Sequence, residues 1–182
     1  MNLSLLVSRL TCDHPVELEP ALEPHPQLAA VLVTLFIKSG QPHVLLIRRS
    51  GNLRSHAGEI SFPGGVFEPD DESLLHTALR ETHEEVGLQL QPEDVIGRLP
   101  TVYTLTEFKV SPFLTLQPSL PRLIPSPREV DEIIQAPLAP LFSTLQRDVG
   151  FKPEEDMWEF WFRQHRVWGA TARILRHITE FL

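Results

Sequence analysis

Cysteine, tyrosine and long apolar runs are nearly missing from this sequence of 182 residues. The only cysteine, Cys12, excludes an internal disulfide and fits a reducing compartment, so we expect the protein in the cytoplasm. No apolar run is long enough to cross a bilayer, so we expect no membrane partner. Residues 1–10, MNLSLLVSRL, lack the basic start and the small-residue cleavage site of a signal peptide, and they predict a short helix instead.

Positive charge is also scarce, because 16 lysines and arginines face 24 acidic residues and the net charge is −8. A field of that sign repels anionic partners, so we expect a small-molecule substrate and no nucleic acid. A phosphate-bearing substrate would need a local basic patch or a bound cation. The length predicts one domain over residues 1–182, and a homo-oligomer is compatible with it.

Apolar and β-branched runs predict strands separated by turn residues. The predicted strands span residues 28–37, 43–49, 58–62, 94–105, 107–116 and 157–163. Interspersed helical segments predict an α/β or α+β sandwich, in which a mixed sheet carries helices on both faces.

The main helix is predicted over residues 72–86, begun by Asp70 or Asp71 and ended by Gly87. A closing amphipathic helix is predicted over residues 171–182. Residues 126–142 predict a short helix and a connector, because Ser126 and Glu129 have the spacing of a capping box.

Three glutamates crowd one turn of the predicted main helix, beside the apolar stripe that should face the sheet. Glu81, Glu84 and Glu85 stand at i, i+3 and i+4, where each like-charge pair costs roughly 0.2–0.5 kcal/mol. A solvated acidic face is the ordinary explanation for such charges. The preceding pair Gly64-Gly65 favours a cation site instead, because glycine permits close backbone approach and its carbonyl can join the carboxylates. Oxygen ligands alone indicate Mg²⁺ or Mn²⁺.

This stretch resembles the Nudix box, G-x5-E-x7-R-E-U-x-E-E-x-G-U. The matching residues are Gly65, Arg80, Glu81, Glu84, Glu85, Gly87 and Leu88. The loop has one extra residue, so either Asp71 or Glu72 fills the first glutamate position, and Thr82 replaces the usual aliphatic residue. The resemblance implies a Nudix-type α/β/α sandwich with a mixed β-sheet over essentially the whole chain, with the box at about residues 65–88.

The resemblance also implies roles for the matched positions. Glu81 and Glu85 would be metal ligands, followed by Glu84 and the carbonyl of Gly65. Arg80 would orient the carboxylates, so Glu81, Arg80 and Glu84 form the implied catalytic group.

A basic stretch precedes the box, LLIRRSGNLRSHAGEISFPGG over residues 45–65. We expect Arg48, Arg49 and Arg54 to bind substrate phosphates, because the planar guanidinium matches phosphate oxygens. The alternative is that Arg48 and Arg49 end a strand on opposite faces and one of them pairs with an acid elsewhere. The spacing resembles the signature of the coenzyme A pyrophosphatase subfamily, L-L-T-x-R-[SA]-x3-R-x3-G-x3-F-P-G-G, with Ile47 in place of threonine.

The resemblance implies divalent-metal-dependent hydrolysis of the pyrophosphate bond of coenzyme A or its thioesters, giving 3′,5′-ADP and 4′-phosphopantetheine. ADP-ribose or another nucleoside diphosphate derivative is the alternative substrate, and a non-catalytic nucleotide-binding module is the alternative class. A glutamate must accept the proton of the attacking water: Glu81 is one candidate, and Glu129 or Glu132 are others. Glu129 fits helix capping better. Tyr103 and Phe108 either stack on adenine or belong to the core.

Overall fold

The computed structural model describes residues 8, 27–149 and 157–180. The helix predicted over residues 1–10 lies outside the described residues apart from Ser8, and so does Cys12. Within the described part of the chain, no helix combines the length and apolar character needed to cross a membrane.

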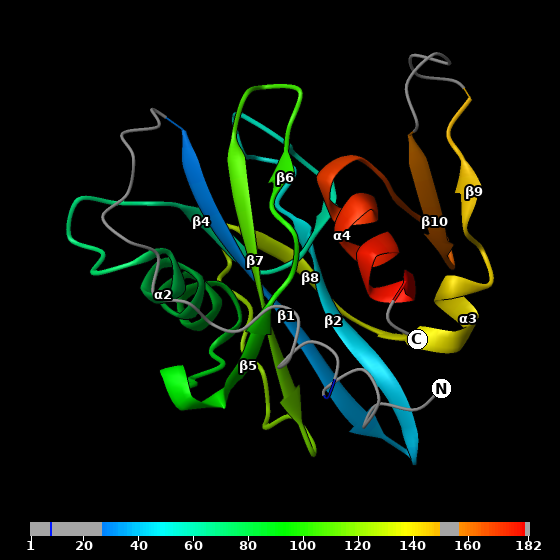
Figure 1. The fold of residues 1–182 in the computed structure, drawn as a ribbon, viewed down its shortest axis with the longest axis horizontal. Helices are drawn as coiled ribbons and strands as arrows, with labels where there is room; N and C mark the ends of the chain where they lie inside the picture. Colours follow the sequence, from blue (N-terminus) through cyan, green and yellow to red (C-terminus); the bar gives the residue numbers. More distant parts are fainter. Residues whose placement is uncertain (1–7, 9–26, 150–156, 181–182) are drawn as a thin grey trace.

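An eight-stranded mixed sheet forms the centre of the fold (Figure 1). Five of its strands lie side by side in the order β3-β2-β1-β7-β5. Of the other three, β4 pairs with β1, β6 pairs with β7 and β8 pairs with β2. The long strands β1 and β7 are parallel, and the other pairs are antiparallel. The strands are β1 (Leu28–Lys38), β2 (Gln41–Arg49), β3 (Ile60–Ser61), β4 (Gly64–Val66), β5 (Val95–Arg98), β6 (Val102–Tyr103), β7 (Lys109–Gln117) and β8 (Val130–Pro137).

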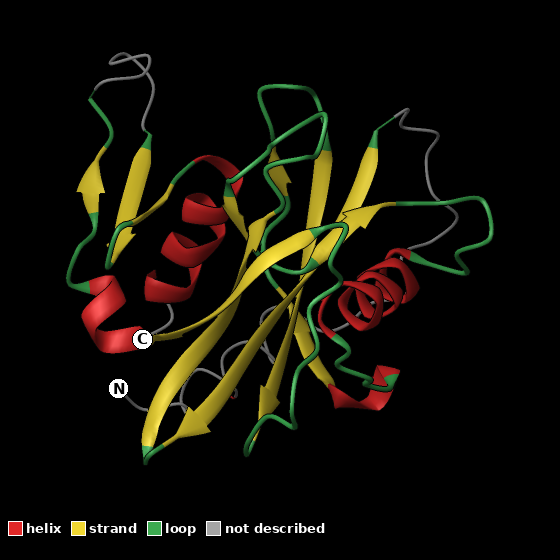
Figure 2. Cartoon of the chain, turned by 180° about the vertical axis from the view of Figure 1, so that it is seen from behind, coloured by secondary structure: helices red, strands yellow, loops and turns green. Residues whose placement is uncertain are grey.

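Helices cover both faces of this sheet, as the view from behind in Figure 2 also shows. Alternate side chains of a strand point to opposite faces. Leu28, Ala30 and Leu32 of β1 therefore pack against α2 (Leu74–Val86). Their neighbours in β1 pack with α3 (Leu138–Phe142) and α4 (Gly169–Glu180) on the other face. The predicted sandwich with a mixed sheet is confirmed.

A smaller three-stranded sheet lies beside α3 and α4, with the order β11-β10-β9. Its strands are β9 (Gln146–Arg147), β10 (Trp158–Phe162) and β11 (His165–Val167). Only β10 was predicted, because the other two strands are too short to show alternation. A short 3₁₀ helix, η1 (Pro92–Asp94), leads into β5.

The prediction of a helix and connector over residues 126–142 is wrong for its first part. No helix begins at Ser126, and the segment instead forms the turn before β8, with α3 following only at Leu138. Long-range pairing decides this, because β8 forms a ladder with β2 from Pro137 to Val130. The single strand predicted over residues 94–105 is also wrong, since it is divided into β5 and β6.

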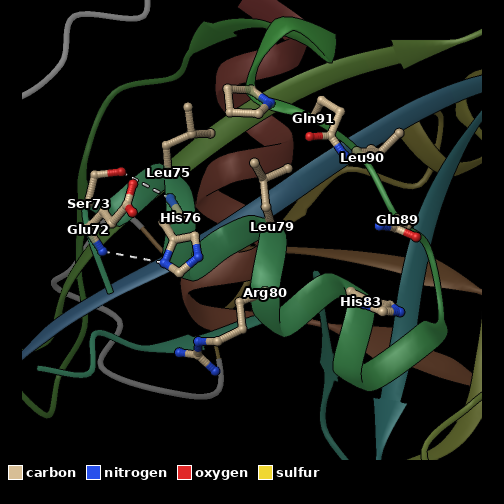
Figure 3. A pocket seen from close by; sticks show the side chains of 11 residues that line it. Glu72, Ser73, Leu75, His76, Leu79, Arg80, His83, Gln89, Leu90 and Gln91 are labelled. Atoms are coloured by element: carbon tan, nitrogen blue, oxygen red, sulfur yellow. Dashed lines mark hydrogen bonds between the residues drawn. The ribbon is translucent and has the colours of Figure 1, made fainter. Parts of the chain in front are cut away.

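The main helix begins later than predicted and has a different N-cap. The cap of α2 is Ser73, whose side chain accepts a hydrogen bond from the backbone N–H of His76, rather than Asp70 or Asp71 (Figure 3). Gly87 ends the helix in the left-handed conformation, with φ of 70°, as predicted. The predicted apolar stripe, Thr82 included, is buried.

Candidate active site

The two glycines of β4 lie directly beside the acidic face of α2. The backbone N–H of Gly64 donates to Glu85 Oε2 at 2.9 Å. Gly65 lies under the carboxyl group of Glu81, so that a Cβ added there would be 2.5 Å from Glu81 Cδ. The absence of a side chain at Gly65 thus makes room for one carboxylate, while the backbone of Gly64 holds another.

Arg80 is fixed by Asp71, which settles which acid of the loop pairs with it. Arg80 Nε and Nη2 donate to the two carboxylate oxygens of Asp71 at 2.8 and 2.9 Å. The side chain of Asp71 is buried and also accepts from Thr77 Oγ1 and from the backbone N–H of Glu68. Burial by itself raises the pKa of Asp71, but these hydrogen bonds outweigh it and hold that pKa well below its ordinary value. Glu72 is exposed and lies one residue before the N-cap Ser73.

The free side of the Arg80 guanidinium faces the glutamates of the next turn. Arg80 Nη1 donates to Glu81 Oε1 at 3.1 Å and to Glu84 Oε2 at 3.3 Å. Arg80 thus bridges Asp71 and Glu81, with its guanidinium held on one side by the Asp71 pair. The side chain of Glu84 is 54% exposed, so water screens it far more than the other two glutamates.

Glu85 is the most deeply buried acid of the group, with 2% of its surface exposed. Burial raises the pKa of Glu85 to about 8, against the opposing effects of the Gly64 N–H and of Arg49, and the charges of Glu81 and Glu129 add to the rise. Burial likewise raises the pKa of Glu81. Two desolvated carboxylates that also repel each other are unfavourable as anions unless a cation lies between them.

Glu129 joins this cluster from a distant part of the chain. The turn before β8 is tied to the end of α2, because the backbone N–H of Ser126 donates to the carbonyl of Glu85 at 2.8 Å. The carbonyl of Glu129 in turn accepts from the N–H of Ser50 at 2.8 Å. The charge of Glu129 acts on both Glu81 and Glu85. The interpretation of Glu129 as a helix-capping residue is wrong, since no helix begins there.

The arginines of the basic stretch are divided between two faces of the sheet. Arg49 ends β2 on the side of α2, with Nη1 at 3.5 Å from Glu85 Oε1. Arg48 lies on the opposite face, with its guanidinium 3.8 Å from Asp131 Oδ2 and 3.7 Å from Glu132 Oε2. Arg54 is exposed in the loop that joins β2 to β3. The structure therefore brings Arg49 to the acidic cluster and turns Arg48 away from it.

The two aromatic candidates also differ in their surroundings. Tyr103 is 58% exposed on β6, whereas Phe108 packs against the core. A hollow between α2 and residues 89–92, seen in Figure 3, is lined by Leu75, Leu79 and Leu90 and by polar residues that include Arg80. None of the three box glutamates lines it, so the hollow is separate from the acidic cluster at the glycine pair.

The donor chemistry of the cluster fits a hard divalent cation. Glu81, Glu85 and Glu129 offer only oxygen atoms, and Gly65 brings backbone directly under Glu81. A bound cation would offset both the desolvation and the mutual repulsion of these carboxylates. Among residues 27–149 and 157–180, however, no three acidic, histidine or cysteine side chains converge closely enough to enclose an ion. The cluster thus has ligands of the right type without forming a closed cage.

Comparison with known proteins agrees with this arrangement. The model of the NUDIX domain matches residues 25–177. An uncharacterized Nudix hydrolase, NudL, of Photorhabdus laumondii is 38% identical over 156 residues, which cover 84% of this chain and 83% of that protein. The NudL protein of Salmonella paratyphi B is 38% identical over 183 residues, which cover 94% of each chain.

Solved structures share the fold at lower identity. A MutT/nudix family protein from Enterococcus faecalis superimposes with a TM-score of 0.56 and 20% identity, covering 81% of this chain and 52% of that one. The NUDIX domain of NrtR from Shewanella oneidensis, complexed with ADP ribose, superimposes with a TM-score of 0.51 and 24% identity. The match covers 66% of this chain and 79% of that one. With its glycine pair, its arginine-held glutamates and these relatives, the chain belongs to the Nudix hydrolase family.

Proposed function

We propose that this protein hydrolyses the pyrophosphate bond of coenzyme A or its thioesters, giving 3′,5′-ADP and 4′-phosphopantetheine. The observation that carries the hydrolytic part is the pair of Glu81, partly buried, and Glu85, buried, beside Gly64 and Gly65, next to Arg49. The part that concerns coenzyme A rests on the resemblance of residues 45–65 to the signature of that subfamily.

The residues divide the work of holding the substrate and the cation. Glu81 and Glu85, with Glu84 and the carbonyl of Gly65, would hold Mg²⁺ or Mn²⁺. Arg80 keeps Glu81 in place through its bond to Asp71. Arg49 and Arg54 would bind phosphate oxygens, a contact that suits the guanidinium fork. When bound, the cation supplies charge neutralisation on the diphosphate and lowers the pKa of a coordinated water.

A carboxylate must take the proton when the oxygen of water attacks phosphorus and the bridging P–O bond breaks. We assign this role to Glu129, because Glu81 is already hydrogen-bonded to Arg80. Glu132 is less suited, since it faces Arg48 and His165 on the other side of the sheet. The proton-transfer step predicts that Glu129→Gln lowers kcat by roughly a hundredfold or more.

The deciding experiment identifies the products of coenzyme A hydrolysis by mass, with and without a chelator. Formation of 3′,5′-ADP and 4′-phosphopantetheine only when Mg²⁺ or Mn²⁺ is present would support the proposal. Rapid cleavage of ADP-ribose, with poor turnover of every acyl form of coenzyme A, would overturn the choice of substrate and leave the chemistry intact. Tight nucleotide binding without any turnover would indicate a non-catalytic module.

A further inference from the structure

Strand β8 contains a bulge at the point where it reaches the active site. Glu132 lies opposite Arg48 of β2, but Val130 lies opposite Arg49, so Asp131 is an extra residue without a partner in the ladder. Because the extra residue interrupts the alternation of side chains, the residues before the bulge and those after it are out of step with each other. Val130 accordingly packs with Ile47 and Val86 on the side of α2, although strict alternation from Glu132 would send it to the opposite face.

Polar contacts hold this bulge from the face opposite the carboxylate cluster. Asp131 Oδ2 accepts from the backbone N–H of Gly51 at 3.2 Å and lies 3.8 Å from Arg48 Nη2. Arg48 Nε lies 3.7 Å from Glu132 Oε2, which is also 3.4 Å from Nε2 of the buried His165. Arg48 thus contacts both acids, one at the bulge and one beside it.

Glu129 lies two residues before the bulged residue, in the turn that is hydrogen-bonded to the end of α2. Only Val130 separates Glu129 from the bulged residue Asp131, and its carbonyl accepts from Ser50, directly after Arg49. The strands β2 and β8 lie side by side here (Figure 1). Any change in the bulge therefore shifts the segment that carries Glu129 relative to α2, and a displacement of about 1 Å can lower a rate a hundredfold.

We propose that Arg48 and Asp131 are positioning residues, which hold the bulge of β8 so that Glu129 points at Glu81 and Glu85. This inference rests on the proposed function, in which Glu129 takes part in hydrolysis. It replaces the prediction that Arg48 binds substrate phosphate with a role on the opposite face of the sheet.

The two roles of Arg48 differ in what they do to kcat and to KM. If Arg48 binds substrate phosphate, Arg48→Ala would raise KM, and KM would rise equally when Glu129 has also been replaced. A positioning residue would lower kcat, and its effect would disappear once Glu129 is replaced, because coupled residues are not additive. The contacts of Arg48 are half-exposed and long, so the thermal midpoint should fall by at most about 3 °C.

The experiment measures kcat, KM and thermal midpoints for Arg48→Ala and Asp131→Ala, each alone and combined with Glu129→Gln. We expect each single variant to lower kcat by on the order of tenfold with KM changed less than about twofold. Neither should lower kcat further in the Glu129→Gln background. Lys38→Ala is the matched control. Lys38 of β1 donates a hydrogen bond to Gln135 of β8, away from the bulge, so its loss should change neither kcat nor KM.

Wild-type kcat in Arg48→Ala and Asp131→Ala, or a full additional loss in the Glu129→Gln background, would overturn the inference. A wild-type rate for Glu129→Gln itself would also overturn it. If Asp131→Ala does not fold, Asp131→Asn takes its place, because it keeps an acceptor for Gly51 and loses only the charge. Failure of the proposed function looks different, since the wild-type protein would then turn over no coenzyme A, and the same comparison can be run on whichever diphosphate it cleaves.

Discussion

Alanine at Gly65 should disable the site with little loss of stability, whereas alanine at Gly64 should strongly destabilise the fold. The two glycines are neighbours in β4, but an added Cβ meets different atoms. At Gly65 it would lie 2.5 Å from Cδ of Glu81, the far end of a flexible side chain. At Gly64, with φ of +150°, it would lie 2.6 Å from the backbone Cα of Val31 in β1.

The expected magnitudes follow from these contacts. To restore an ordinary contact of 3.4 Å for Cδ and for the still closer Oε1, the carboxyl group of Glu81 must move by about 1 Å, and such a shift at a reacting centre can cost on the order of a hundredfold in rate. The cost in stability should stay below about 1 kcal/mol, because the side chain can turn aside. Gly64→Ala forces apart two paired strands and strains the backbone, so we expect a loss of about 2–5 kcal/mol.

Thermal midpoints and steady-state rates on the same preparations separate the two effects. Gly64→Ala should lower the midpoint by roughly 5–15 °C, and Gly65→Ala by less than about 4 °C while losing most of kcat. A Gly65→Ala protein with wild-type kcat would refute the placement of Glu81 over Gly65. Equal thermal losses in both variants would refute the distinction between side-chain and backbone contact.

Three further predictions test the acids of the site. Glu85→Gln should lower kcat at least about a hundredfold, as expected for a major electrostatic contributor, and the more exposed Glu84 should lose less when changed to Gln; equal rates for the two would contradict the importance of burial. Because the pKa of Glu85 is about 8 in the folded protein and near 4.5 when unfolded, its contribution to the free energy of unfolding of the metal-free protein is fully present below pH 4.5 and is lost as the pH rises through about 8. The total is on the order of 5 kcal/mol, so chemical unfolding between pH 5 and 9 should show wild-type protein losing stability relative to Glu85→Gln, and parallel curves would count against the burial of this carboxyl. Asp71→Asn should cost about 3 kcal/mol because it breaks a buried ion pair, while Glu72→Gln should leave the unfolding midpoint unchanged; the reverse order would mean that Glu72 is the partner of Arg80.

The fixed pair of Asp71 and Arg80 explains how one helix can carry three adjacent glutamates. Nε and Nη2 of the Arg80 guanidinium donate to Asp71, and Nη1 donates to Glu81 and Glu84. It therefore neutralises part of their repulsion without pairing fully with either. Glu85 has no such help from Arg80 and depends on the N–H of Gly64 and on Arg49 instead.

Local patterns in the sequence were enough to predict the helix that carries the box, its end at Gly87 and the burial of its apolar stripe. They were also enough to place Glu81, Glu84 and Glu85 on one turn beside a glycine pair, because the helical repeat fixes the relation of residues three and four apart. The strands over residues 28–37 and 43–49 followed from apolar runs that needed no partner to be recognised.

Only the tertiary structure decided between acids and arginines that look alike in the sequence. Asp71 rather than Glu72 pairs with Arg80 because Asp71 is the one buried beside Thr77. Alternation along the strand predicts opposite faces for Arg48 and Arg49, but only the packing of α2 shows that Arg49 contacts Glu85 and that Arg48 contacts Asp131. Glu129 reaches the site because β8 pairs with β2, and pairing between distant segments depends on contacts that no local pattern of residues records.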